Sequence, residues 1–308
     1  MNSLYSKKTN KMPSKYKTLW EEELKNKKFP DRYTGLLKID YEELKNLKNS
    51  FNKEKGKLLI KELIDGKVLL VKNAFSKELV LEIKNKTIQF WKNNPNTFQK
   101  MVEGCPDFHR IITPDVAKNY AVGAVRHTTY FFNWNSDPCG FNEKIYERWR
   151  YSKYLAGLDF YQYEKNTPKN GAVDRIQIVC YPPKYGGVEV HKDTNSNSSL
   201  AISCYLSSKK NKDFSKGGFY CIDNNGKKID LEDEIDSGDI SLYCPTIDHG
   251  VECIDNNERT SKDNYDWNSG IGRWWMGLFT NDSNMKLNRK TSLSLDKYHS
   301  DKLLSESK

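Results

Sequence analysis

Residues 188–197 read V-E-V-H-K-D-T-N-S-N, a valine-rich stretch with a histidine and an aspartate two positions apart. Valine favours strands, whose side chains alternate between two faces, so His191 and Asp193 are predicted to point the same way. An imidazole and a carboxylate on one face are two of the three ligands of a facial metal site. For this stretch alone, a surface strand that ends in a turn is the simpler interpretation, because short His-x-Asp matches often arise by chance.

Short strand-like runs separated by turn residues follow Gly171 along the chain. They lie at 175–181, 188–191, 199–206, 219–223, 239–244 and 273–279. Pro-Pro, Gly-Gly and Asn-Asn-Gly sequences separate them, and these are turn signals. Many short strands of even spacing predict a β-sandwich or a jelly roll.

The chain before Gly171 has a different character. Apolar residues recur at helical spacing over 41–64 and 77–93, where Ser76 can cap the second helix, and 143–155 is also predicted to be helical. Between them, V-L-L-V-K-N (68–73) predicts a buried strand and the aromatic run 128–134 predicts core packing. We therefore predict four segments. They are a basic N-terminal tail or peripheral helix (1–40), a helical and strand lead-in packing on the core (41–170), a strand-rich core (171–281) and a polar C-terminal tail (282–308).

Composition excludes several classes of protein. The 308 residues carry a net charge of +9, but Lys and Arg are interspersed with Asp and Glu, so we expect no nucleic-acid partner. The seven cysteines form no C-x-x-C pair and several lie in apolar runs, which favours buried free thiols in a reducing compartment. No segment approaches the ~20 apolar residues that span a bilayer, and M-N-S-L-Y-S-K-K lacks the apolar region of a signal peptide. We expect a cytoplasmic protein without a membrane partner.

A third candidate ligand occurs in C-P-T-I-D-H-G-V-E (244–252), where His249 follows a strand and a turn. Two histidines and one carboxylate can hold Fe(II) and leave positions open for a chelating cosubstrate and dioxygen. Arg273 begins the last apolar strand and could bind the far carboxylate of 2-oxoglutarate through two charge-assisted hydrogen bonds. Trp275 and Gly277 would share its face, with Gly277 leaving room. A lone arginine at a strand start is otherwise a surface residue.

Six sequence segments carry a resemblance to a known family. They are Y-P-P-K-Y-G-G-V-E-V-H-K-D (181–193), A-I-S-C-Y-L (201–206), G-G-F-Y (217–220), S-G-D-I-S-L-Y (237–243), D-H-G-V (248–251) and G-R-W-W-M-G-L-F (272–279). In this order they resemble the Fe(II)/2-oxoglutarate-dependent oxygenases of the prolyl-hydroxylase and phytanoyl-hydroxylase type. D-G-K-V-L-L-V-K-N-A-F-S (65–76) resembles the family's lead-in more weakly. The resemblance implies a double-stranded β-helix, or jelly roll, as the mainly β core of an α+β chain flanked by N-terminal helices.

The resemblance also implies roles for individual residues. His191, Asp193 and His249 would bind iron, and Arg273 would hold the distal carboxylate of 2-oxoglutarate. Tyr181 would lie beside this cosubstrate, and the hydroxyl group of Tyr205 could join the arginine. Either tyrosine could instead serve only strand packing.

Two features depart from the family pattern. The arginine comes later after the distal histidine than in relatives, so residues 255–270 are interpreted as an inserted loop that could act as a lid. Arg259 has the more usual spacing but lies inside this polar loop, so Arg273 is preferred. Trp275 stands where several relatives have a small residue.

The resemblance implies Fe(II), 2-oxoglutarate and dioxygen as cofactors, and hydroxylation of an unactivated C–H bond with release of succinate and carbon dioxide. We expect a small polar metabolite as substrate, such as an amino acid or a biosynthetic intermediate. A protein side-chain (prolyl-type) hydroxylase is the alternative, and a non-catalytic jelly-roll binding module is an alternative of another class. Phe279 stands where the nucleic-acid repair branch has a second arginine. Residues expected at the pocket mouth are Arg110, Arg126, His127, Tyr130, Trp134, Lys192, Thr194 and Asn195. Arg126 could pair with a substrate carboxylate or phosphate, but a structural salt bridge is the preferred expectation.

Overall fold

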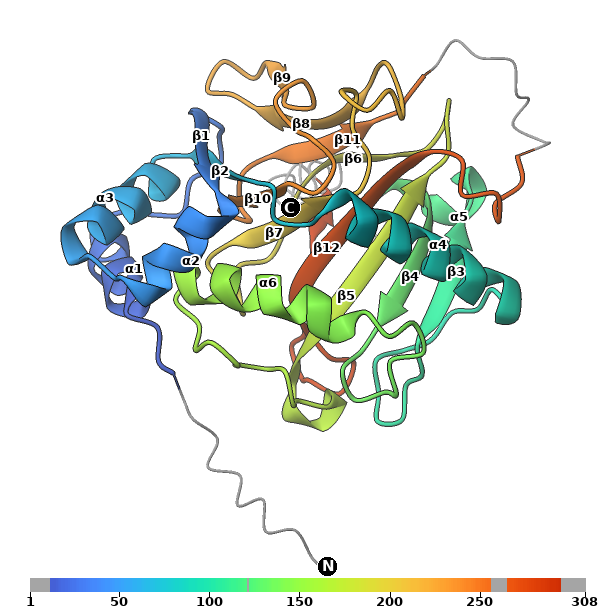
Figure 1. The fold of residues 1–308 in the computed structure, drawn as a ribbon, viewed down its shortest axis with the longest axis horizontal. Helices are drawn as coiled ribbons and strands as arrows, with labels where there is room; N and C mark the ends of the chain where they lie inside the picture. Colours follow the sequence, from blue (N-terminus) through green and yellow to red (C-terminus); the bar gives the residue numbers. More distant parts are fainter. Residues whose placement is uncertain (1–11, 121, 256–264, 295–308) are drawn as a thin grey trace, which may run out of the picture.

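The computed structural model describes residues 12–120, 122–255 and 265–294. A strongly curled, mainly antiparallel β-sheet forms its centre, with helices packed beside it (Figure 1). The helices are α1 (Tyr16–Leu24), α2 (Tyr41–Asn49), α3 (Lys53–Ile64), α4 (Lys77–Asn93), α5 (Pro114–Ala117), α6 (Asn142–Leu155) and the 3-10 helix η1 (Pro168–Asn170). The strands are β1 (Gly35–Asp40), β2 (Lys67–Lys72), β3 (Phe108–Ile112), β4 (Ala124–Phe131), β5 (Ala172–Tyr181), β6 (Gly187–Lys192), β7 (Ala201–Tyr205), β8 (Gly218–Ile222), β9 (Lys228–Asp230), β10 (Ile240–Tyr243), β11 (His249–Glu252), β12 (Arg273–Asp282) and β13 (Leu293–Ser294).

The strands from β5 to β12 alternate between two halves of the curled sheet. One half has the order β10-β7-β12-β5 and the other the order β6-β11-β8-β9. The chain crosses from one half to the other at every connection except the β8–β9 hairpin, which is the connectivity of a jelly roll, or double-stranded β-helix. Strand β4 joins the halves, because it pairs with β6 at its start and with β5 further along. The predicted jelly-roll core is confirmed.

Helices α4 and α6 cover the outer face of the first half, in front of β12 and β5 in Figure 1. Because strand side chains alternate, Ile176, Ile178 and Met276 point outward into one large core that also contains Phe90 of α4 and Trp149 of α6. Ser76 caps α4 by accepting a hydrogen bond from the Leu79 amide, as predicted. The inward faces of the same strands are left for the side chains described below.

The N-terminal elements extend the sheet and close one end of the core. Strand β1 lies parallel to β2, which pairs with β10, and helices α1, α2 and α3 gather beside them (Figure 1). Tyr16, Leu19 and Trp20 of α1 are buried, and the Trp20 indole donates to the Leu155 carbonyl at 2.8 Å. Residues 16–24 are therefore a packed helix, and residues 35–40 form a strand that the sequence did not indicate.

The helix predicted over 41–64 is two helices separated by residues 50–52. Asn52 accepts a hydrogen bond from the Lys55 amide at 3.0 Å and so starts a new helix with its own cap. The apolar spacing runs on through this break, which is why periodicity alone joined the two helices. Strands β3, β9, β11 and β13 were also not predicted, because strands of two to five residues are too short to show a clear alternating pattern.

All seven cysteines are free, and six of them are buried. Burial raises the pKa of Cys180 to about 12, so its thiol is protonated and inert at neutral pH. Within the described residues, no helix has both the length and the apolar character needed to cross a bilayer.

Gly272 is expected to be intolerant of substitution. It has a φ of +142°, and a Cβ atom there would lie 2.2 Å from the Tyr181 carbonyl oxygen. Gly272→Ala should lower the free energy of unfolding by more than about 3 kcal/mol, since backbone strain and a clash with backbone act together. Gly226→Ala is the matched control. Its φ is +76° with open space around it, so urea unfolding should show a loss of only about 1 kcal/mol. Equal losses in the two variants would contradict the clash.

Candidate metal and cosubstrate site

The candidate metal site lies where β6 ends and β11 begins. His191 and His249 are direct cross-strand partners in these antiparallel strands, and Asp193 follows β6 immediately. The turn between β10 and β11 thus places His249 opposite the His-x-Asp pair. One nitrogen or oxygen atom from each of the three side chains lies within 4.8 Å of the others.

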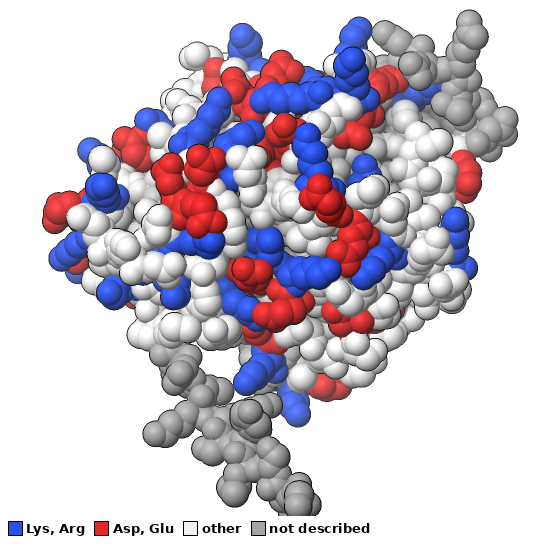
Figure 2. Space-filling view, in the orientation of Figure 1, with Lys and Arg blue, Asp and Glu red and all other residues white. Residues whose placement is uncertain are grey.

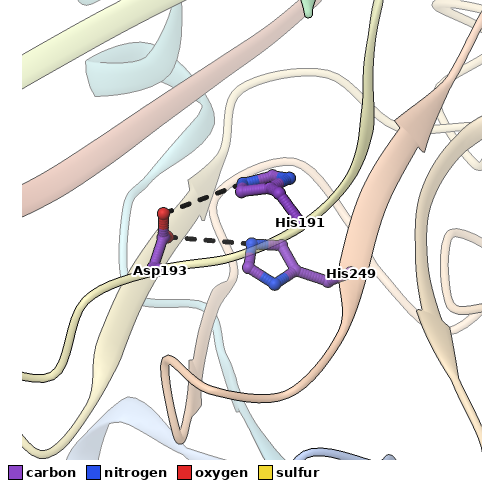
Figure 3. A group of neighbouring side chains, drawn as sticks. All are labelled: His191, Asp193 and His249. Atoms are coloured by element: carbon purple, nitrogen blue, oxygen red, sulfur yellow. Dashed lines mark ion pairs between the residues drawn. The ribbon is translucent and has the colours of Figure 1, made fainter. Parts of the chain in front are cut away.

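Both imidazoles point Nε2 toward the Asp193 carboxylate, which lies to one side of the two rings (Figure 3). His191 Nε2 lies 3.7 Å from Asp193 Oδ1, and His249 Nε2 lies 3.7 Å from Asp193 Oδ2. These distances are too long for hydrogen bonds. The Nδ1 atoms contact backbone carbonyls, those of Glu189 at 2.9 Å and Ile247 at 2.8 Å, which sets the tautomer with the proton on Nδ1. The lone pairs of both Nε2 atoms are therefore free for a metal ion.

The electrostatics of the site favour the protonation states that bind metal. Burial, reinforced by the neighbouring His191, lowers the pKa of His249 to about 4. Burial opposes ionisation of Asp193, but His191, His249 and a hydrogen bond from Ser292 together keep its pKa below the usual value. Near neutral pH, His249 is neutral and Asp193 is ionised, and a divalent cation requires both states of its ligands.

Ser292 was not found from the sequence. Its hydroxyl group donates to Asp193 Oδ1 at 2.5 Å, and the adjoining strand β13 pairs with β6 opposite His191. It lies in a segment expected to be a polar tail, and nothing in the local sequence distinguishes it from other serines. The structure places residues 289–292 along the wall of the site cavity.

Arg273, the first residue of β12, is fully buried and lines the same cavity as His191, Asp193 and His249. Its Nε donates to Glu232 Oε1 at 2.7 Å, and its Nη2 forms an ion pair with the same oxygen. Neither terminal nitrogen has a partner with hydrogen-bond geometry among the described residues. This is the arrangement a bound carboxylate would complete: Glu232 holds the inner edge of the guanidinium while the terminal nitrogens keep donors to spare.

Glu232 is the second residue of the site that sequence reasoning missed. It is fully buried, and its Oε1 also accepts from the Phe219 amide at 2.7 Å. Burial raises the pKa of Glu232, and the adjacent Arg273 opposes this rise. The residue lies in L-E-D-E-I-D (231–236), an acidic run that looks like solvated loop, so its burial could not be read from the sequence.

The two candidate tyrosines flank Arg273. Its guanidinium carbon lies 5.7 Å from the ring centre of Tyr181 and 5.8 Å from that of Tyr205. The Tyr205 hydroxyl is hydrogen-bonded to Ser241 Oγ at 2.8 Å, so it contacts Ser241 and not the arginine. Only Tyr181 of the two lines the cavity, and its role beside a cosubstrate stays a prediction.

The room expected at Gly277 is already filled. The rings of Trp275 and Phe279, 5.9 Å apart between centres, close over this glycine, and a Cβ atom there would meet both of them within 2.4 Å. Gly277 therefore allows two aromatic rings to meet on the inner face of β12, and these rings line the cavity wall.

Several residues expected at the pocket mouth lie elsewhere. His127 and Trp134 pack away from the cavity, because His127 stacks on Trp91 with ring centres 3.7 Å apart and Trp134 stacks on Phe132 at 4.4 Å. Lys192 pairs with Asp248. Arg110, Arg126, Tyr130 and Thr194 do line the cavity. The salt bridge expected for Arg126 was wrong: within the described part of the chain it has no carboxylate partner, and its Nε is buried without a hydrogen bond.

The inserted loop is described only in part, and Arg259 lies outside the described residues. The end of the loop, from residue 265 onward, packs against the connection between β5 and β6, where the rings of Tyr265 and Trp267 contact Tyr185. The Trp267 carbonyl contacts His127 Nδ1 at 2.8 Å, which anchors this end of the loop to β4.

His127 is expected to make folding pH-dependent. Burial, reinforced by His109, lowers its pKa from 6.5 to about 3. His127 in the unfolded chain therefore binds a proton near pH 6.5, whereas His127 in the folded chain stays neutral down to about pH 3. Its contribution to the free energy of unfolding is complete above about pH 6.5. This contribution is lost as the pH falls toward 3, by up to about 1.4 kcal/mol per pH unit. Urea unfolding between pH 7.5 and 4.5 should show a smaller slope for His127→Gln than for the native chain, and equal slopes would contradict this assignment.

Charges of both signs are mixed on the visible face of the molecule. Figure 2 shows lysine and arginine side chains interspersed with aspartate and glutamate and no continuous basic stripe on that face. Many of them form surface ion pairs, such as Lys38 with Glu234 and Lys144 with Glu82.

Comparison with known proteins gives only distant similarity. No protein-family model and no curated protein matches the chain. Among solved structures, a full-length Neurospora crassa protein in complex with alpha-KG and thymine is similar with a TM-score of 0.49 and 12% identity, over 88% of this chain and 96% of that one. A Trichoplax adhaerens prolyl hydroxylase in complex with a hypoxia inducible factor peptide has a TM-score of 0.47 and 13% identity, over 76% and 92%. Similarity at this level does not by itself assign a family or a reaction.

Proposed function

We propose that this chain is a dioxygenase that uses Fe(II) and 2-oxoglutarate to hydroxylate a C–H bond. One observation carries the proposal: the trio of His191, Asp193 and His249 shares a cavity with the unsatisfied terminal nitrogens of Arg273. Two imidazoles and one carboxylate are the ligand set of non-haem Fe(II) oxygenases. A buried guanidinium with free donors in the same cavity fits the distal carboxylate of 2-oxoglutarate.

Different residues of the chain would bind the iron, bind the cosubstrate and exclude water. His191, His249 and Asp193 would hold the iron, and the carbonyls of Glu189 and Ile247 keep both Nε2 atoms aimed at it. Arg273 would orient the cosubstrate, with Glu232 fixing the guanidinium. Bound iron would supply dioxygen activation coupled to the conversion of 2-oxoglutarate to succinate and carbon dioxide. The aromatic rings of Tyr181, Trp275 and Phe279 would shield the reacting centre from water.

A small polar molecule is the substrate class that the cavity supports best. Its volume of about 390 Å³ falls within the range of small-molecule sites. Its wall carries many polar groups, and so suits a polar metabolite better than an apolar one. Hydroxylation of a protein side chain remains the alternative, and it would require an open groove leading to the trio.

An anaerobic titration of metal-free protein with Fe(II) and 2-oxoglutarate tests the proposal. We expect a saturable visible charge-transfer band from the chelate, and we expect His191→Ala to lose it because one of three ligands is missing. Asp115→Asn removes an exposed carboxylate of α5 that does not line the cavity and should keep the band, as the matched control. No band in the native protein would overturn the oxygenase and favour a non-catalytic jelly-roll binding module.

A further inference from the structure

The arginines of the described chain fall into two groups. Each of the first group forms an ion pair with a carboxylate, and its members are Arg32, Arg148, Arg150 and Arg273. Those of the second group form none with any described residue, and all of them line the cavity that contains the metal trio. They are Arg110, Arg126, Arg175 and Arg289. We call this second group the arginine cluster.

Strand register explains why three of these side chains meet. Arg110 of β3 lies opposite Thr128 of β4, which is flanked on its own face by Arg126 and Tyr130. Tyr130 lies opposite Gln177 of β5, one same-face position from Arg175. All of them therefore belong to the inward face of the sheet. Arg289 approaches from the segment that follows β12, where its Nε donates to the Asp282 carbonyl at 3.1 Å.

The cluster is held by neutral partners only. Arg110 donates to the hydroxyl groups of Tyr120 and Tyr130 at 3.0 and 2.9 Å, and Arg175 donates to Gln177 Oε1 at 2.8 Å. The guanidinium carbons of both arginines lie near the Tyr130 ring, at 5.3 and 4.8 Å from its centre. Hydrogen bonds to neutral groups fix the geometry of these cations without neutralising their charge.

Buried donors in this part of the cavity lack acceptors. The Nε atoms of Arg110, Arg126 and Arg175 and the Nδ2 atom of Asn281 are buried without a hydrogen-bond partner in the described chain. Buried donors normally find acceptors, and an unpaired buried charge is costly. Four such donors along one cavity wall indicate that an anion with several acceptor oxygens completes the site.

Arg175, which pairs with Phe279, lies away from the proposed cosubstrate position, whereas Arg126 is the cluster member nearest to Asp193. Arg273 pairs with Tyr181 at one end of the β12–β5 ladder, and Phe279 pairs with Arg175 six residues further along. At about 3.3 Å per residue, the two positions are roughly 20 Å apart along the strands. 2-Oxoglutarate held by Arg273 therefore cannot also satisfy Arg175.

We propose that the arginine cluster binds an anionic group of the substrate, either a phosphate monoester or a pair of carboxylates, and so selects an anionic metabolite for the reaction. That the bound anion is part of a substrate rests on the proposed function. The anion-binding site itself rests only on the positions of the arginines. Phosphate and carboxylate both match the fork of a guanidinium, and several arginines around one anion give specificity over neutral analogues.

Electrostatics agree with a cluster that lacks its counter-ion. Although burial favours the neutral phenol, Arg110, Arg126 and Arg175 together lower the pKa of Tyr130 to about 8. Burial and the neighbouring arginines lower the pKa of Arg175 itself to about 10. The positive potential that causes these pKa shifts attracts anions to the cavity and raises their local concentration there.

The test measures anion binding to the metal-free full-length protein, so it does not depend on iron or turnover. Calorimetric titration in about 0.15 M NaCl would use inorganic pyrophosphate for the phosphate arm and tricarballylate for the carboxylate arm. We expect saturable binding of at least one probe, weakened roughly tenfold or more in Arg126→Gln and in Arg175→Gln. Arg126 makes no side-chain hydrogen bond in the described chain, so its variant should fold even if Arg175→Gln does not.

Two controls locate the anion. Lys118→Gln removes one exposed positive charge that directly follows α5 and does not line the cavity, so this variant should bind like the native chain. The paired variant Glu232→Leu/Arg273→Met should also keep binding. The proposal is overturned if neither probe binds, if Arg126→Gln and Arg175→Gln bind like the native chain, or if the paired variant loses binding. If the Fe(II) and 2-oxoglutarate titration gives no charge-transfer band but the anion still binds, the proposed oxygenase function is contradicted and the anion site is not.

Discussion

Replacing Glu232 by alanine is expected to lower the free energy of unfolding by about 3–5 kcal/mol, because it leaves the fully buried guanidinium of Arg273 without a carboxylate. The Phe219 amide would lose its acceptor as well. Urea unfolding of the metal-free protein measures the loss directly. Glu252→Ala is the matched control, since Glu252 pairs with Lys228 at the exposed surface, and it should cost at most about 1 kcal/mol.

A paired substitution separates the buried charge from simple packing. In Glu232→Leu/Arg273→Met both charges are removed and side chains of similar length remain, so most of the lost stability should return. A double variant that is as unstable as Glu232→Ala would show that packing around residue 232, and not an uncompensated charge, is responsible.

The same paired variant should lose affinity for 2-oxoglutarate by roughly 100-fold or more, because two charge-assisted hydrogen bonds from Arg273 are removed. The metal trio is untouched, so Co(II), used as a spectroscopic probe for the metal site, should bind as in the native chain. The measurement is the concentration of 2-oxoglutarate that half-saturates the charge-transfer band at fixed Fe(II).

Two results would contradict this role of Arg273. If the paired variant binds 2-oxoglutarate with native affinity, the cosubstrate carboxylate is held elsewhere. If Co(II) binding falls together with 2-oxoglutarate binding, the substitution has disturbed the whole cavity. Gln177→Ala, which changes the cavity wall beside Arg175 and leaves Arg273 in place, should leave 2-oxoglutarate affinity unchanged and so controls for general effects on the cavity.

Part of this site could be predicted from short-range patterns. The two-residue spacing of His191 and Asp193 in a valine-rich strand predicts that they share a face, and the structure brings both to His249. Arg273 at the start of an apolar strand was expected to share a face with Trp275, and both residues line the cavity. Such predictions succeed because the alternation of a strand is a local property of the backbone.

Other features depended on contacts between distant segments. Glu232 looks like one residue of an acidic loop, yet it is buried against Arg273, and Ser292 looks like tail, yet it donates to Asp193. The salt bridge expected for Arg126 was wrong because no described carboxylate, not even that of Asp193 in the same cavity, comes within ion-pair distance of it. The helix predicted over 41–64 ran through a break that only its cap at Asn52 reveals.

The sequence by itself determined the strand-rich core, the order of its turns and the shared face of His191 and Asp193, because alternation and turn chemistry are carried by neighbouring residues. Only the tertiary structure decided which charges are neutralised. Strand pairing gave Arg273 its buried glutamate and brought Arg110, Arg126 and Arg175 to one wall without an ion pair to any described acid. Whether a buried charge has a partner depends on register between strands far apart in the chain, and no local pattern encodes it.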